Sequence, residues 1–379
     1  VVLKLDELTK RPQAIACHAW NKDGTLLAFC PMNHEIHIVK YVDGAVTPVE
    51  VLRSHDQKVT SIDWAPESNR IVSCAEDRNA YVWNLESDGW KPTLVMLQFQ
   101  RAAVHVKWSH SEKKFAVASG AKCIAVCYYE EENNWWISKL IDGFESTVLS
   151  LAWHPSDCLM AACSSDRSVQ LFAAAVKGVD NKPPRLFGGD VSLGKLGTKI
   201  CGITSDGWVT DIEFSPDGKM LCFVSHDSCI HFVNMAEVGK SDLVVPSKDN
   251  VRTIRMNGLP HRRILFLSDN YLVAAGHDCN PILYQRRDQV WCEHSKLDDF
   301  KSRKQSAPQA SARNAAFRKF EMASPQSPDA DSNLGDSLPT RHQSCITDLA
   351  TCRGWVSGQS VQLTSVGLDG RLCSWSVSL

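Results

Sequence analysis

Two histidine–aspartate pairs are the first residues of this chain whose types and spacing could do chemistry. His226 precedes Asp227, and His277 precedes Asp278, at matching places in a repeated segment. A nucleophilic site needs a base such as histidine beside a serine or cysteine, and histidine is also a common zinc ligand. Because both pairs stand in a turn between two strand patterns, we interpret their side chains as hydrogen-bonding groups that join strand ends.

No recognisable catalytic motif accompanies these pairs. The chain holds 13 histidines and 15 cysteines, but it lacks the G-x-S-x-G nucleophile elbow. It also lacks a glycine-rich phosphate loop that follows a strand and opens a helix. His34 and His37 stand three positions apart in a strand pattern, so they face opposite sides and are poorly placed to share a zinc ion. The sequence therefore predicts a protein that is not an enzyme, with no catalytic residues, no cofactor and no metal site.

Composition and charge exclude further classes of protein. The net charge is −2 and the isoelectric point is about 6.7, so we expect neither a nucleic-acid partner nor a membrane-surface role. The chain contains no run of about 18 apolar residues, the length that a membrane-spanning helix needs. The cysteines form no C-x-x-C pair and mostly lie in apolar strand runs, as Cys74 and Cys163 do, which predicts unpaired thiols in a reduced, cytoplasmic protein. The first residue is Val1 rather than methionine, so we expect the natural start to lie upstream.

A fixed repeat supplies the strands that position these turns. Tryptophans recur at intervals of 44, 44 and 45 residues, at Trp20, Trp64, Trp108 and Trp153. The second copy reads VTSIDW, the turn APESN, RIVSCA, the turn EDRN and AYVW, which is a strand–turn–strand pattern. A period of about 40–45 residues with short strands is typical of a β-propeller. We expect the aspartates of the second turn to be structural: Asp77, Asp166, Asp227, Asp278 and Asp369.

The copies predict an all-β, seven-bladed propeller that forms one domain over residues 1–379. The last copy offers only three strands, CITDLA, VQLTSVGLDG and RLCSWSV, so a closed ring needs its fourth strand from elsewhere. The segment VVLKLDEL at the N-terminus can supply it, and closure by the two ends removes exposed sheet edges. The alternative is that this segment is an unpaired tail.

A long insert between the last two blades breaks the repeat, at residues 296–340. From Lys301 to Met322 it carries six basic residues and one acid, and its polar composition predicts partial disorder. Within it, residues 309–323 read as a short amphipathic helix with Phe317 and Phe320 on one face. A tethered helix of this kind has the form of a segment that folds into a partner's groove. The alternative is an inert loop whose helix docks on its own propeller.

Trp135 and Trp136 are adjacent in the strand pattern NNWWISKL. Since neighbouring strand residues face opposite sides, one of the two rings must point away from the sheet. The simpler interpretation is an outer strand that packs one ring on the next blade. The alternative interpretation is that one of the two rings lies in a subunit interface, because tryptophan is favoured at binding hot spots.

Several of these segments together resemble one family. CHAWNKDG with EIHIV, the run VTSIDWAPESNRIVSCAEDRNAYVW, NNWWISKLI, STVLSLAWHP and AAGHDCNPILY are similar to the WD-repeat (WD40) subunits of the Arp-two/three complex, which nucleates branched actin filaments. The resemblance runs from about Ile15 to Trp375. The chain departs from the generic WD pattern, since Trp83 and Trp375 are not followed by aspartate.

The resemblance implies a non-enzymatic structural subunit, located in the cytoplasm on the actin-rich cortical cytoskeleton. Its implied partners are actin-related proteins and small helical subunits of the complex, the mother actin filament and nucleation-promoting factors. In this family a helix in the insert reaches the filament, which implies filament contacts by a set of insert residues: Arg313, Phe317, Arg318, Lys319 and Phe320.

Two other functions remain open on the sequence alone. A WD40 adaptor of a ubiquitin ligase or chromatin assembly would hold a peptide across the central opening and would need no actin-facing insert. A propeller enzyme would need acids or metal ligands that converge in the central channel, and no such set is evident in the sequence.

Overall fold

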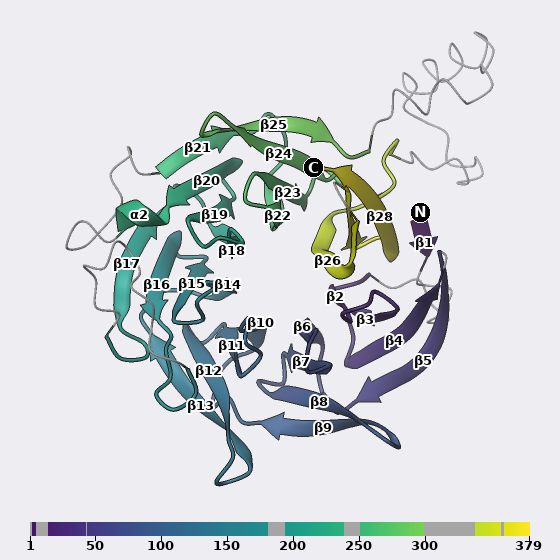
Figure 1. Cartoon of the computed structure of the whole chain (residues 1–379), viewed down its shortest axis with the longest axis vertical. Coiled ribbons are helices and arrows are strands. Elements are labelled where there is room, and N and C mark those ends of the chain that lie inside the picture. The colour runs from purple at the N-terminus through teal and green to yellow at the C-terminus, as the bar shows by residue number, and fades with distance from the viewer. Residues whose placement is uncertain are drawn as a thin grey trace, which may run out of the picture.

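The computed structural model describes residues 2–4, 14–42, 44–180, 194–238, 251–298, 338–357 and 360–379. In these ranges the strands form seven four-stranded antiparallel sheets, arranged as blades around a central axis (Figure 1). The predicted all-β, seven-bladed propeller is therefore confirmed. One four-residue helix, α2 (Met235–Val238), follows the third strand of blade five.

Blades one to four run through the chain in order, each from its innermost to its outermost strand. Blade one contains β2 (Cys17–Trp20), β3 (Leu26–Cys30), β4 (Glu35–Val42) and β5 (Ala45–Arg53). Blade two contains β6 (Val59–Ala65), β7 (Arg70–Ala75), β8 (Ala80–Glu86) and β9 (Gly89–Val95). Blade three contains β10 (Ala103–Trp108), β11 (Lys114–Ser119), β12 (Cys123–Glu130) and β13 (Trp135–Asp142). Blade four contains β14 (Val148–Trp153), β15 (Leu159–Ser164), β16 (Ser168–Ala173) and β17 (Lys199–Thr204).

Blades five to seven keep this order, and the last blade also includes the first strand of the chain. Blade five contains β18 (Val209–Phe214), β19 (Met220–Ser225), β20 (Cys229–Asn234) and β21 (Val251–Arg255). Blade six contains β22 (His261–Ser268), β23 (Tyr271–Gly276), β24 (Ile282–Arg287) and β25 (Val290–Lys296). Blade seven contains β26 (Ile346–Ser357), β27 (Ser360–Gly367), β28 (Arg371–Ser378) and β1 (Val2–Lys4).

The hydrophobic core lies between neighbouring blades. The second strand of a blade is covered on both faces by the adjoining blades, and every residue of β11, β15 and β19 is buried. Such strands read as continuous apolar runs because neither face meets water. The outer strands alternate or are largely exposed, as in β9 and β25. The strength of the repeat in the sequence follows from this difference, since the inner strands carry most of the apolar pattern.

The ring closes through the first and last strands. Val2, Leu3 and Lys4 pair antiparallel with Cys373, Leu372 and Arg371 of β28. The first and last strands of the chain accordingly lie side by side in blade seven (Figure 1). The predicted closure by the N-terminal strand is confirmed, and β28 is left with a partner on both of its edges.

Deleting residues 1–4 is expected to lower the melting temperature by several degrees. The deletion removes the three pairs that β1 makes with β28, and each backbone hydrogen bond contributes about 0.5–1.5 kcal/mol. It also reopens a sheet edge. The measurement is thermal unfolding followed by circular dichroism. Val2→Ser is the matched control, because it changes an exposed side chain and keeps the backbone pairing; an unchanged melting temperature in the deletion would contradict the role of β1 as a clasp.

Neighbouring blades are joined by acids on their inner strands. Asp63 on β6 accepts a hydrogen bond from the backbone N–H of Trp108 on β10, at 2.8 Å. The same link recurs elsewhere in the ring: Asp211 with Ile264 N–H, Glu213 with Phe266 N–H, and Asp348 with His18 N–H. Such a hydrogen bond contributes about 0.5–1.5 kcal/mol, and about 1.5–3 kcal/mol where the acid is ionised. These links fix the register of blade two on blade three, of blade five on blade six and of blade seven on blade one, and so stiffen the ring.

Candidate functional site

The predicted turn aspartates anchor buried side-chain networks in two blades. In blade two, His55 Nδ1 lies 2.8 Å from Asp77 Oδ2, and His55 Nε2 lies 2.8 Å from Ser73 Oγ. Trp83 Nε1–H donates to the same hydroxyl at 2.9 Å. Blade seven repeats this network with one residue of each type: His342, Asp369, Ser365 and Trp375. The acceptor bonds keep the pKa of Asp77 below its usual value, against the opposing effect of burial.

The remaining turn aspartates cap their turns without a tryptophan. Asp166 accepts from the N–H groups of Ser168 and Glu145, both at 2.8 Å. Asp278 accepts from Leu259 N–H at 3.1 Å. The rings of the histidines beside Asp227 and Asp278 lie near each other, with centroids 6.1 Å apart, and the ring of His226 packs edge-on against the exposed ring of Trp208 at 5.7 Å.

Charged residues from several blades converge on the central channel, a set that no local sequence pattern indicates. Arg263 Nη1 lies 3.4 Å from Asp211 Oδ1, and Arg263 Nε lies 3.7 Å from Asp348 Oδ1. Lys107 and Glu213 line the same cavity, which holds about 210 Å³. These residues come from the inner strands of four different blades and meet only because the ring brings those strands together. The acids Asp211, Glu213 and Asp348 also accept the blade-to-blade backbone bonds described above, so their arrangement serves the ring.

Glu213 is the channel acid with the largest change in acidity. Burial raises its pKa to about 8, against the opposing attraction of Lys107 and the hydrogen bond from Phe266 N–H. An acid with a raised pKa in the folded protein costs stability once the unfolded chain ionises. Stability is therefore expected to fall as the pH rises from the ordinary value of 4.5 toward 8.

Glu213→Gln is expected to flatten this pH dependence while keeping the acceptor for Phe266 N–H. The stability gap between variant and wild type should widen with rising pH over this window, by up to about 1.4 kcal/mol per unit. Urea unfolding at several pH values measures it, with Glu86→Gln on the exposed end of β8 as control. Parallel plots of the free energy of unfolding against pH for Glu213→Gln and wild type would contradict a raised pKa at Glu213.

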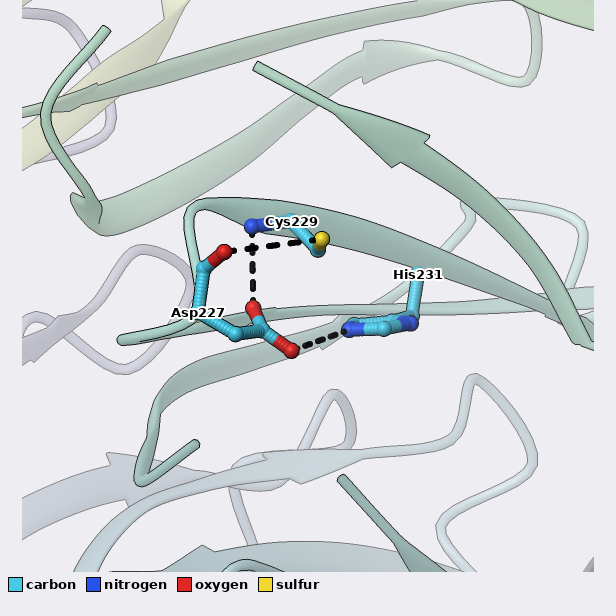
Figure 2. Close-up of side chains that lie close together, drawn as sticks. All are labelled: Asp227, Cys229 and His231. Atoms are coloured by element: carbon cyan, nitrogen blue, oxygen red, sulfur yellow. Dashed lines mark hydrogen bonds and ion pairs between the residues drawn. The ribbon is translucent and has the colours of Figure 1, made fainter. Parts of the chain in front are cut away.

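A cluster of three potential metal ligands lies at the turn between β19 and β20 (Figure 2). The ligand atoms of Asp227, Cys229 and His231 all lie within 4.8 Å of one another, and no other such set of three is found in the part of the chain that the structure describes. The sequence predicts no metal site, because it groups Asp227 with the other turn aspartates only. The spacing D-x-C-x-H was the available signal, since alternate residues of a strand share one face.

The two adjacent tryptophans of β13 lie on opposite faces of their sheet. The ring of Trp136 packs between Phe115 and Trp108, with centroid distances of 5.1 and 5.9 Å. Arg70 lies over the Trp108 ring at 5.1 Å and closes this cluster. Trp135 points away from it and is 56% exposed. Trp135 is therefore available for a partner, whereas Trp136 belongs to the interior.

The insert residues expected to contact a filament lie outside the described residues, as does the expected helix at 309–323. What the structure describes is the base of the insert. Asp298, at its beginning, accepts a hydrogen bond from the backbone N–H of Arg341, at its end, at 2.5 Å. Asp298 N–H also donates to Asn280 Oδ1 at 3.0 Å. The two ends of the insert are thereby fixed side by side between blades six and seven.

Comparison with known proteins gives the family. The family described as WD domain, G-beta repeat matches residues 46–84, 137–172 and 197–234. Each match begins near the outer strand of one blade and ends in the third strand of the next. The chain is 41% identical to the Xenopus laevis actin-related protein 2/3 complex subunit 1A-A over 366 residues, which cover 96% of this chain and 94% of that protein. The chain belongs to the actin-related protein 2/3 complex subunit 1 family.

Relatives from distant organisms support this membership. Subunit 1A of Arabidopsis thaliana is 37% identical over 369 residues, covering 96% of this chain and 94% of the relative. Subunit 1 of Schizosaccharomyces pombe is 36% identical over 378 residues, covering 95% and 96%. The family resemblance seen in the sequence is thus confirmed. No helix in the described part of the chain combines the length and hydropathy that a membrane span requires.

Proposed function

We propose that this chain is a non-enzymatic structural subunit of an actin-branching Arp2/3 complex. The observation that carries the proposal is that the likeness to subunit 1 proteins extends over 96% of the chain rather than over the repeats alone. Its partners are then the actin-related proteins and small helical subunits of the complex, and its place is the actin-rich cortex of the cytoplasm. The subunit contributes geometry and binding energy, and nucleation-promoting factors dock on the assembled complex.

The ring is suited to this role because it is rigid. Inner-strand acids tie each linked blade to the next through backbone N–H groups, and the threonines Thr60, Thr210 and Thr347 donate across the blade boundaries to main-chain carbonyls. A body that does not deform holds its partners at fixed angles. Branch geometry requires that property more than it requires chemistry.

We also propose that the insert contacts the side of the mother filament. Phe317 and Phe320 would serve as apolar anchors, with Arg313, Arg318 and Lys319 as basic contacts. The fixed base formed by Asp298 and Arg341 supports this proposal, since it sets where the insert leaves the ring. The competing interpretation is an inert loop, and a variant with Phe317→Ala and Phe320→Ala separates the two.

Trp135 is the described residue best suited to a subunit interface. Trp135→Ala is expected to leave the free energy of unfolding within about 0.5 kcal/mol, because the ring is exposed. If the indole of Trp135 anchors a partner, the variant should bind the rest of the complex up to about tenfold more weakly than wild type. Competition between tagged variant and wild-type chains for assembly measures this. Lys139→Ala on the same strand is the control, and equal incorporation of Trp135→Ala and wild type would remove Trp135 from the interface.

Co-purification tests the function itself. A tagged chain isolated from cytosol is expected to carry actin-related proteins in equal amounts, together with the small subunits. Recovery with a ubiquitin ligase or chromatin assembly instead, without actin-related proteins, would favour the WD40 adaptor and overturn the proposal.

A further inference from the structure

We propose that Asp227, Cys229 and His231 form a zinc site on the turn between β19 and β20 of blade five. This goes beyond the proposed scaffold role and does not depend on it. Three different ligating side chains meet within five positions of the chain, and their ligand atoms lie within 4.8 Å (Figure 2). The site lies on the face of the ring that carries the turns between second and third strands.

Local backbone geometry brings the three side chains together. Ser228 occupies the left-handed region with φ of 59°, which reverses the chain between Asp227 and Cys229. Asp227 Oδ1 accepts the N–H of Cys229 at 2.9 Å and the hydroxyl of Ser225 at 2.5 Å, so the turn is held from within. Cys229 and His231 are alternate residues of β20 and therefore share one face. The turn and the first residues of β20 therefore bring the three side chains together.

The two oxygens of Asp227 have different roles. Oδ1 is used by the short bonds that hold the turn. Oδ2 has only long contacts, at 3.4 Å to Ser205 Oγ and 3.5 Å to His231 Nε2. Oδ2 is therefore the oxygen available for a cation, and binding there leaves the bonds of the turn intact.

The ring of His231 is already oriented for coordination. Its Nδ1 lies 2.9 Å from Thr253 Oγ1 on the neighbouring strand, and its plane stacks on Phe223 at 4.6 Å. In the tautomer that carries its proton on Nδ1, the ring donates to Thr253, and the lone pair of Nε2 faces Asp227 Oδ2 at 3.5 Å and the Ser225 hydroxyl at 3.2 Å. That hydroxyl already donates to Asp227 Oδ1, so the lone pair of Nε2 can be turned to a cation. Zinc-bound histidines are commonly held in this way by a hydrogen bond from the second ring nitrogen.

The donor set selects zinc over harder cations. One sulfur, one imidazole nitrogen and one carboxylate oxygen suit Zn²⁺, whereas Mg²⁺ and Ca²⁺ prefer oxygen ligands throughout. Tetrahedral zinc places its ligand atoms roughly 3.3–3.6 Å apart, from bonds of about 2.0–2.3 Å. To bind zinc, the most distant pair of ligand atoms would therefore have to move roughly 1 Å closer together. Asp227 and Cys229 are partly exposed, so solvent can reach the ion and a water can fill the fourth position.

Metal binding to the purified, reduced full-length chain tests the site. After chelator treatment, the chain is titrated with Zn²⁺ against a chromophoric competitor, and with Co²⁺ for its thiolate-to-metal absorption band. We expect one zinc per chain, a cobalt band, and at least tenfold weaker zinc binding in Cys229→Ser and in Asp227→Asn. Cys292→Ser is the matched control, because Cys292 is an exposed cysteine on β25 that lies outside the cluster.

Each result decides the matter. Full occupancy by one zinc, lost in Cys229→Ser and kept in Cys292→Ser, supports the site. Failure of the wild-type chain to take up one zinc, or equal affinity in Cys229→Ser and wild type, overturns it. Because Cys229 is partly exposed, circular dichroism should show that its serine variant keeps the fold, so that a loss of zinc reports on the ligand.

Discussion

Replacing Lys114 with methionine is expected to lower the free energy of unfolding by about 3–5 kcal/mol. Lys114 is fully buried on β11, yet its ammonium group is saturated. It donates to the backbone carbonyls of Asp157 and Ala174, both at 2.7 Å, and pairs with the carboxylate of Asp180. Its Nζ also lies over the ring of Trp153 at 5.0 Å. The side chain therefore joins blade three to the turn and outer segment of blade four.

Methionine fills much of the same space but leaves a carboxylate without its cation. The side chain of Asp180 is only 7% exposed, so its charge would lose a close partner in a poorly solvated place. Breaking one side of a buried pair is strongly destabilising for this reason, whereas replacing both sides is often close to neutral. The double variant Lys114→Met with Asp180→Asn is accordingly expected to regain part of the loss.

Urea unfolding of both variants and wild type makes this measurement. Lys113→Met is the matched control, because Lys113 is the exposed neighbour in the chain and its loss should stay within about 0.5 kcal/mol. A loss below 1 kcal/mol in Lys114→Met would show that the buried ion pair is not what holds these two blades together.

Replacing Phe317 and Phe320 with alanine is expected to reduce filament-side binding and branching tenfold or more. Burying one phenylalanine contributes about 1.5–3 kcal/mol, and about 1.4 kcal/mol corresponds to a tenfold change in affinity. The loss of affinity on removing both anchors should therefore exceed tenfold, even when the two side chains are only partly buried on the partner. Assembly with the other subunits should persist, since the ring supplies those contacts.

Charge reversal in the same segment gives a second readout. Arg318→Glu with Lys319→Glu is expected to weaken filament binding most at low salt, because exposed charges are screened as the ionic strength rises. Filament co-sedimentation and branch counting on the reconstituted complex measure both effects. Ser324→Ala with Ser327→Ala, outside the expected helix, is the control. Normal branching by the double alanine variant would return the insert to the alternative of an inert loop.

The sequence predicts the fold well because the residues that repeat along the chain are the ones that are buried between the blades. Trp64 and Trp108 are buried at corresponding ends of inner strands, so their regular spacing reports the blades directly. The closing strand was predictable for a different reason, since a three-strand final copy leaves a defined vacancy that VVLKLDEL fits. Neither inference needs contacts between distant residues.

The channel charges and the zinc cluster could not be predicted in the same way. Arg263 meets Asp211 and Asp348 only when three blades are in place, and no local pattern records that meeting. The neighbours of Asp227 are local, but D-x-C-x-H also fits an ordinary strand start. Whether the motif forms a ligand cluster or an ordinary strand start depends on the backbone conformation at Ser228 and Cys229. The residue types alone do not specify that conformation.

The clasp of β1 on β28 also has a consequence for the order in which the protein is made. The ribosome makes Val2 long before its partner Cys373. Six blades can thus form on the nascent chain while the seventh waits for its own C-terminal strand, and contacts of such separation form slowly. Until β28 has been made, β1 offers an unpaired edge to other chains. Completion of the ring consequently waits for the synthesis of β28, however early the other six blades form.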